Sequence, residues 1–283
     1  NMERRVLLDH TPNRFVIVHY HIMKNAGMTI ASILEREFGD GFYDVHRNSP
    51  NGHITPDDLT AFLAATPSAR ALSSHHFRFP VPPSSSIRFF DCCPVRHPLD
   101  RLESLYTFFR TTPPTNSLVR LAHSLDLPEF LRTLLEKYPD QAMNLQTRTL
   151  ANSDGFRPAD VDDLERAIRV VRKSAMLALV NRLDESLAAA EYFMAPAFPD
   201  LRLHYTAHNV ARAAVPFAKR VQLLSDRCGE GLFRQLERAN ELDLQLVDAA
   251  EEELERRISF VPSFPSRLKT FRESCTPSPH TFA

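Results

Sequence analysis

The sequence predicts an α/β fold in which helices flank a parallel sheet and the C-terminal half of the chain is largely helical. Up to about residue 115, short apolar runs alternate with amphipathic stretches, a pattern typical of strands joined by helical crossovers. Beyond that point the apolar periodicity is mostly helical. With 283 residues, 43% hydrophobic and 24% charged, the chain is long enough to bury a sizeable core.

The N-terminal half holds most of the expected strands. The runs at 14–20 and 87–93 are apolar, as buried strands are. Pro98 suits the first turn of a helix because its fixed φ is already helical. In chain order, we expect a strand at 14–20, a helix at 28–38, a short helix from Asp57 or Asp58 to Thr66, strands at 70–74 and 87–93, and a helix from Pro98 to Arg110.

Helices dominate the pattern of the C-terminal half. In chain order, we expect helices at 128–137, 139–151 and 160–173, a strand at 174–180, a helix that Asp184 caps at its N-terminus, and a helix at 232–258 with Leu244, Val247, Leu254 and Ile258 on one face. From Pro262 the chain is rich in Pro and Ser and is predicted to be an extended tail. We therefore expect one domain over residues 1–261, followed by a tail at 262–283.

The composition excludes several classes of protein. Lys and Arg total 34 against 35 for Asp and Glu, so the basic excess of a general nucleic-acid-binding protein is absent. No apolar run approaches the roughly 20 residues that span a bilayer, and the first residues show no signal-peptide core. The four cysteines predict neither a disulfide framework nor a zinc site. These features favour a reduced, cytoplasmic setting.

The first segment that carries chemistry follows the first expected strand. An apolar run at 15–18 enters a short loop with a lysine and small residues, and an amphipathic pattern begins directly after it. Loop and helix-start N–H groups, the helix dipole and the lysine together predict a cradle for phosphate or sulfate. In a Walker A loop the lysine follows the glycines, whereas Lys24 precedes Gly27. The cradle residues are Lys24, Asn25, Ala26, Gly27, Met28 and Thr29.

A second segment repeats the order of strand, loop and helix at 92–110. Arg96 lies in the loop, and Ser104 lies about two turns into the following helix. An arginine can bind a phosphate through two N–H groups and a serine adds one donor; Arg101 is a less certain member. The alternative is that Arg96 forms a structural salt bridge and Ser104 faces water. Since both loops follow parallel strands, we expect them at the same edge of the sheet.

These segments resemble the sulfotransferases. Residues 24–29 (KNAGMT) are similar to the 5′-phosphosulfate loop of that family, often written K-T-G-G-T-[ST], and residues 95–106 (VRHPLDRLESLY) resemble its 3′-phosphate segment, V-R-D-P-x-x-R-x-x-S-x-Y. Residues 144–150 (NLQTRTL) and 181–187 (NRLDESL) resemble the branch that acts on carbohydrates, near the heparan sulfate 2-O-sulfotransferases.

The resemblance implies a P-loop-like α/β fold and the donor 3′-phosphoadenosine 5′-phosphosulfate (PAPS). The sulfuryl group would pass to an acceptor hydroxyl, with a sugar favoured by the carbohydrate branch. Lys24 would stabilise the leaving group without a metal ion. The segment at 73–79 (SSHHFRF) resembles the family's G-H-F-x-F, which makes His76 the general base. His75 is the alternative after a one-residue shift, and His19 and His21 flank the loop.

The match has departures, and other functions compete with it. Met28 stands where many members have a hydroxyl residue, and His97 replaces the usual Asp. A P-loop kinase or NTPase would need an acidic magnesium ligand at a strand end, for which Asp91 is the one candidate. A third hypothesis is a non-catalytic module that binds a nucleotide or a glycan. The acceptor could also be a lipid, a peptide tyrosine or a small natural product.

Overall fold

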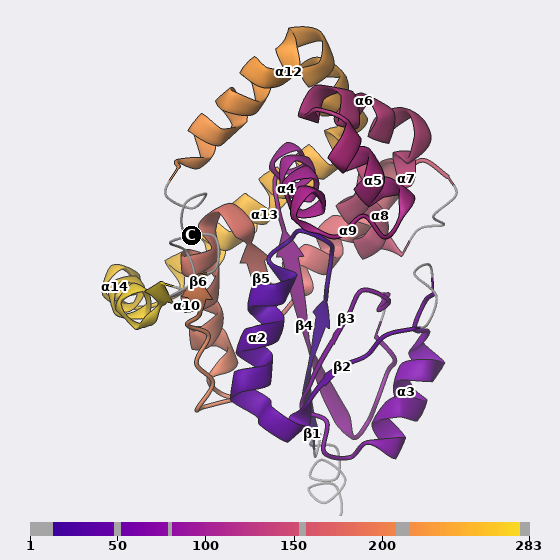
Figure 1. Ribbon diagram of the computed structural model, residues 1–283. Helices are drawn as coiled ribbons and strands as arrows, with labels where there is room; N and C mark the ends of the chain where they lie inside the picture. Colours follow the sequence, from indigo (N-terminus) through magenta and orange to yellow (C-terminus); the bar gives the residue numbers. More distant parts are fainter. Residues whose placement is uncertain (1–13, 48–51, 79–80, 153–156, 208–214, 278–283) are drawn as a thin grey trace, which may run out of the picture.

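Five parallel strands form the central sheet of the computed structural model, which describes residues 14–47, 52–78, 81–152, 157–207 and 215–277 (Figure 1). The strands lie in the order β2-β3-β1-β4-β5. This arrangement, with helices around the sheet, confirms the predicted α/β fold. The strand bounds are β1 Arg14–Tyr20, β2 Phe42–Asp44, β3 Ala71–Ser74, β4 Ile87–Val95 and β5 Met176–Leu179.

Helices make up most of the remaining described chain. Several begin at recognisable signals: Thr55 and Asp160 each form a capping box, and Pro98 opens its helix as predicted. The helices are α2 Gly27–Phe38, α3 Pro56–Ala65, α4 Pro98–Thr111, α5 Ser117–Ser124, α6 Leu127–Lys137, α7 Pro139–Ala142, α8 Leu145–Ala151, α9 Val161–Lys173, α10 Leu183–Met194, α12 Phe217–Ala239, α13 Glu241–Ser259 and α14 Phe264–Ser274. Two further short strands, β6 Thr206–Ala207 and β7 Thr276–Pro277, pair with each other in a separate sheet.

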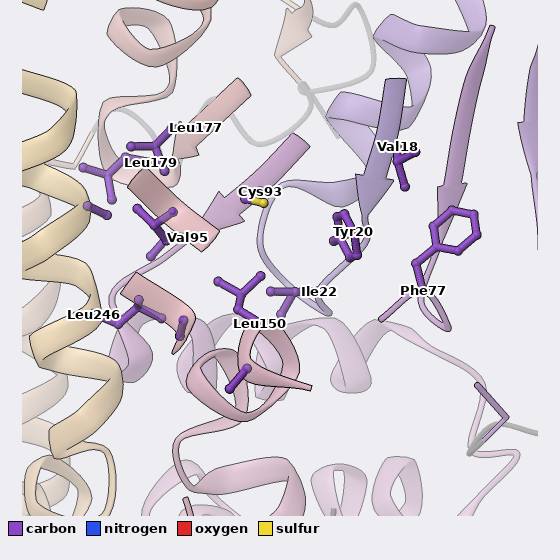
Figure 2. Packing of buried hydrophobic residues seen from close by; sticks show 14 of the residues in the cluster. Val18, Tyr20, Ile22, Phe77, Cys93, Val95, Leu150, Leu177, Leu179 and Leu246 are labelled. Atoms are coloured by element: carbon purple, nitrogen blue, oxygen red, sulfur yellow. The ribbon is translucent and has the colours of Figure 1, made fainter. Parts of the chain in front are cut away.

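Both faces of the sheet are covered by apolar side chains. One face is covered by α2 and α10, and α14 packs against α10 in the same apolar cluster. The other face packs against α3, α8, α9 and α13, and Figure 2 shows part of this second cluster. Because successive strand residues point to opposite faces, Cys92 belongs to the first cluster and Cys93 to the second. The two thiols therefore lie in the core on opposite faces of the sheet.

A third apolar cluster lies beyond the carboxyl end of the sheet. It joins α4, α5, α6 and α12 without any strand. Figure 1 shows these helices past the arrowhead of β4. The loops that follow β1 and β4 therefore lie between the sheet and this helical layer. Within the described part of the chain, no helix combines the length and the apolar character needed to cross a bilayer.

Two predicted helices are each broken at an asparagine. The helix expected at 139–151 is divided into α7 and α8, because Asn144 adopts a left-handed backbone with φ 46°. The helix expected at 232–258 is the end of α12 followed by α13, with Asn240 between them. The two breaks hold each other: Asn144 N donates to Asn240 Oδ1 at 3.1 Å. Periodicity alone does not detect such a contact across 96 residues of chain.

Other expectations also differ from the structure. Asp184 lies in the first turn of α10, and the N-cap is Arg182, whose side chain forms no cap hydrogen bond. The segment after residue 262 was expected to be extended, but α14 forms there. Pro265 lies in the first turn of α14, where its missing N–H costs nothing. Phe271 is buried in the same apolar cluster as α10, and this burial supports the helix. Strand β2 lies between the helices expected at 28–38 and from Asp57 or Asp58, where we expected no strand.

Candidate functional site

The loop after β1 forms a cradle at the start of α2. Lys24 and Ala26 both have left-handed backbone conformations, with φ of 68° and 57°, and α2 begins at the next residue, Gly27. No described side chain caps this N-terminus, and its first turn holds no acidic residue. The partial positive charge of the helix start is therefore not offset locally. This geometry is compatible with an anion at residues 24–29.

The side chain of Asn25 holds the loop rather than facing outward. It is fully buried, and its Nδ2 donates to Pro94 O at 3.0 Å and to Gln146 Oε1 at 2.7 Å. The first bond ties the loop to the end of β4, and the second ties it to α8. Of the residues predicted to contact the donor, Asn25 can do so only through its backbone.

Gln146 is a residue of the site that sequence reasoning did not single out. Its Oε1 also accepts from Arg96 N at 2.8 Å, and its Nε2 donates to Arg96 O at 2.7 Å. The same amide donates to Asp243 Oδ2 at 3.2 Å. One buried side chain thus anchors both candidate anion loops to α13. The available signal was its place within the 144–150 segment.

Arg96 links the second loop to the first. Its Nη1 donates to Lys24 O at 2.6 Å, and its Nε donates to Asp100 Oδ2 at 2.7 Å. The salt bridge considered as an alternative role for Arg96 is thus present, together with a direct bond to the cradle. Ser104 is half-buried on α4, one turn beyond Asp100.

Arg101, the less certain member of the second segment, has a structural contact. Its side chain is fully buried, and Nη2 donates to Gln141 O at 2.8 Å. Burial lowers the pKa of Arg101 to about 10. This arginine therefore supports the helical layer.

Lys24 lies beside an exposed aromatic ring. Its Nζ is 4.2 Å from the centroid of Phe108 on α4, and that ring is 40% exposed. Met28, in the first turn of α2, is 74% exposed. The thioether at this position points to solvent, so contact with a ligand phosphate falls to the backbone of the turn.

A stack of histidine rings runs from the cradle to the loop after β3. A Cβ atom at Gly27 would lie 1.9 Å from Cδ2 of His21, so the His21 ring rests directly on the start of α2. The rings of His21 and His75 have centroids 3.8 Å apart, and His19 lies 5.3 Å from His21. Burial, followed by the charges of His75, His46 and Lys24, lowers the pKa of His21 to about 3. His21 is therefore neutral at pH 7.

Hydrogen bonds give His75 and His76 opposite tautomers in their neutral forms. His75 Nδ1 lies 2.6 Å from His21 O; since a carbonyl only accepts, this nitrogen carries the proton and Nε2 is left with its lone pair. His76 Nδ1 instead accepts from Arg47 N at 2.9 Å, which places its proton on Nε2. Burial also lowers the pKa of His75. As the structure has them, His75 presents a base, and His76 must first release Arg47.

The site contains cationic and imidazole groups rather than a metal-ligand set. Over the described ranges, no cluster of three or more His, Cys, Asp or Glu side chains could hold a metal ion. Asp91, the candidate magnesium ligand of a kinase, lies within β4, and burial raises the pKa of its carboxyl to about 6.

Comparisons with known proteins show one extended similarity and no named family. No family model matches the chain. A protein of Archaeoglobus fulgidus, described as uncharacterized, is 25% identical over 252 residues, which make up 83% of this chain and 95% of that protein. The similarity covers most of both chains, and the description of the relative names no activity.

Proposed function

We propose that this chain is a sulfotransferase that moves the sulfuryl group from PAPS to an acceptor hydroxyl. The observation that carries the proposal is the bond from Arg96 Nη1 to Lys24 O, 2.6 Å long. It joins the two segments whose sequences resemble the 5′-phosphosulfate loop and the 3′-phosphate segment of that family. A donor with two separated phosphate groups needs two such loops side by side, whereas a nucleoside triphosphate needs one.

The described residues fit this donor. The uncapped start of α2 and the Lys24 ammonium suit the 5′-phosphosulfate, held by the backbone of residues 24–29. Arg96 and Ser104 suit the 3′-phosphate. Gly27 leaves room for the His21 ring at the start of α2.

The reaction needs one electrostatic contact and one base. The acceptor oxygen forms a bond to sulfur while the bond from sulfur to the 5′-phosphate oxygen breaks, which releases adenosine 3′,5′-bisphosphate. Lys24 stabilises the negative charge on that oxygen. The acceptor proton passes to a histidine of the pair. The sequence resemblance favours His76 for this role, and the tautomers favour His75.

The acceptor and the cellular setting are parts of the same proposal. The resemblance of 144–150 and 181–187 to the carbohydrate branch supports a sugar hydroxyl or a small molecule as acceptor. The buried thiols of Cys92, Cys93 and Cys228 are free, which supports a reducing, cytoplasmic environment.

A transfer assay with sulfur-labelled PAPS tests the proposal. The purified protein is incubated in EDTA with panels of sugars, phenols, lipids and tyrosine peptides, alongside Lys24→Met. Label transferred to one acceptor class by the wild type and lost in Lys24→Met supports the proposal. Binding of adenosine 3′,5′-bisphosphate without transfer to any panel supports the non-catalytic module instead. Binding of ATP with magnesium, but not of the bisphosphate, supports a kinase.

A further inference from the structure

Asp100 occupies a central place among the cationic groups of the site. Its side chain is 2% exposed, and each carboxylate oxygen accepts from a different arginine. Oδ2 lies 2.7 Å from Nε of Arg96, and Oδ1 lies 3.1 Å from Nε of Arg220 in the first turn of α12. One buried carboxylate thus lies between two guanidinium groups, and the second comes from a residue 120 positions further along the chain than Asp100.

The arrangement continues on both sides of Asp100. Arg96, which Asp100 contacts, also donates a hydrogen bond to Lys24 O in the cradle. On the other side, the Phe217 ring of α12 packs against the ring of His97 with centroids 5.2 Å apart. The start of α12 is therefore fixed against the loop that carries Arg96.

Two guanidinium cations contact one carboxylate, and the first of them also reaches the lysine loop at the uncapped start of α2. A buried ion pair is a poor source of stability by itself, because desolvation offsets most of its attraction. A nearly buried guanidinium held by a fixed carboxylate instead keeps one orientation, which suits the recognition of an anion such as phosphate.

From these contacts we infer that Asp100 is a positioning residue: it fixes the plane of the Arg96 guanidinium for a 3′-phosphate and couples α12 to that subsite. The inference rests on the proposed function and goes beyond it, since the resemblance assigns no role to Asp100. Asp100 would act through Arg96 and would not touch the ligand.

The test compares adenosine 3′,5′-bisphosphate with adenosine 5′-monophosphate by calorimetry. For Asp100→Asn we expect the Kd of the bisphosphate to rise about tenfold. The reason is that the charge-assisted hydrogen bond from Arg96 to Asp100, which orients the Arg96 guanidinium, is lost. The Kd of the monophosphate should change by less than about twofold, because Asn25 and Gln146 still anchor the cradle. A loss of folding alone would weaken both ligands together and would overturn the inference.

Two further variants test the inference even if Asp100→Asn does not fold. Arg220→Gln detaches α12 from Asp100 and should also lower the preference for the bisphosphate. Arg227→Gln is the matched control, since Arg227 pairs with Glu103 at 3.3 Å and joins the same two helices. Equal effects of both variants on the ratio of the two Kd values would mean that helix docking alone matters, which contradicts the inference.

The wild-type ratio separates the two levels of the account. If wild-type protein binds the bisphosphate no more tightly than the monophosphate, the proposed function fails, and the inference fails with it. If the wild type prefers the bisphosphate and neither Asp100→Asn nor Arg220→Gln changes that preference, only the inference fails.

Discussion

At the scale of single residues, the two adjacent histidines after β3 differ in which ring nitrogen carries the proton. His75 Nδ1 donates to a carbonyl and leaves Nε2 able to accept, whereas His76 Nδ1 already accepts from Arg47 N. The sequence motif alone could not separate them, because the partners come from segments 54 and 29 residues away.

This difference makes a kinetic prediction. With an acceptor in hand, His75→Ala should lower kcat by about 10²-fold or more, the usual worth of a general base, with unchanged Kd for adenosine 3′,5′-bisphosphate. His76→Ala should lower kcat by less, through loosening of the Arg47 contact. Steady-state kinetics and calorimetry on the two variants check this. A larger loss of kcat in His76→Ala than in His75→Ala would show that His76 is the general base.

Gly27 is required by the ring that lies against it. In Gly27→Ala the new Cβ would lie 1.9 Å from His21 Cδ2, so we expect a loss of about 1–3 kcal/mol in the free energy of unfolding. Gly231→Ala is the control, since a Cβ there meets no atom within 4 Å, and it should be neutral or slightly stabilising. Urea denaturation measures both. Equal stability of the two variants would show that His21 moves away without cost.

Asp91 gives a pH dependence with a definite sign. Burial raises the pKa of its carboxyl from 3.8 to about 6, so between these values the unfolded chain loses a proton that the folded protein keeps. The free energy of unfolding is therefore not reduced by Asp91 below about pH 4, and the ionisation of Asp91 reduces it progressively as the pH rises to about 6 and above. Asp91→Asn should add about 2 kcal/mol to the free energy of unfolding at pH 7.5 and little at pH 4.

Urea denaturation at the two pH values measures this effect. Asp200→Asn, at an exposed position, serves as the control. An equal gain for Asp91→Asn at both pH values would contradict the origin of the effect in ionisation.

At the scale of elements, the two candidate anion loops depend on a helix from a distant part of the chain. Gln146 of α8 bonds to Asn25, to both backbone groups of Arg96, and to Asp243. Removal of this one amide leaves several buried groups without a partner, and each such group is costly.

We therefore predict that Gln146→Ala lowers the free energy of unfolding by about 3 kcal/mol or more. Gln222→Ala, which removes an exposed contact to Asp226 on α12, should change it by less than about 0.5 kcal/mol. Chemical denaturation of both variants provides the comparison. A stability change for Gln146→Ala no larger than that of Gln222→Ala would show that the network does not hold the loops.

At the scale of the whole molecule, local sequence patterns predicted those helices and strands that have a clear local signal, such as an apolar run or a capping residue. The strand expected at 14–20 has the observed bounds of β1, and Pro98 begins α4 as expected. The order of strands and helices then implied a parallel sheet, with both loops at its carboxyl edge. The reason is that periodicity and capping are local properties, which the sequence records directly.

Contacts between distant segments could not be predicted in the same way. The Asn144–Asn240 pair divides two apparent helices, and the His21–His75 stack arises only because β3 lies beside β1. The same holds for Arg220, which reaches Asp100 from another helix. Each of these contacts is decided by packing of the complete chain, which local periodicity does not report.

The central claim is that the two loops together bind a donor with separated 5′ and 3′ anionic groups. Calorimetric titration of the wild type with adenosine 3′,5′-bisphosphate in EDTA tests this most directly, with Arg96→Ala as the comparison. The account predicts binding at a single site without magnesium, weakened at least about tenfold in Arg96→Ala. No binding at millimolar bisphosphate, or equal binding by both proteins, would contradict it.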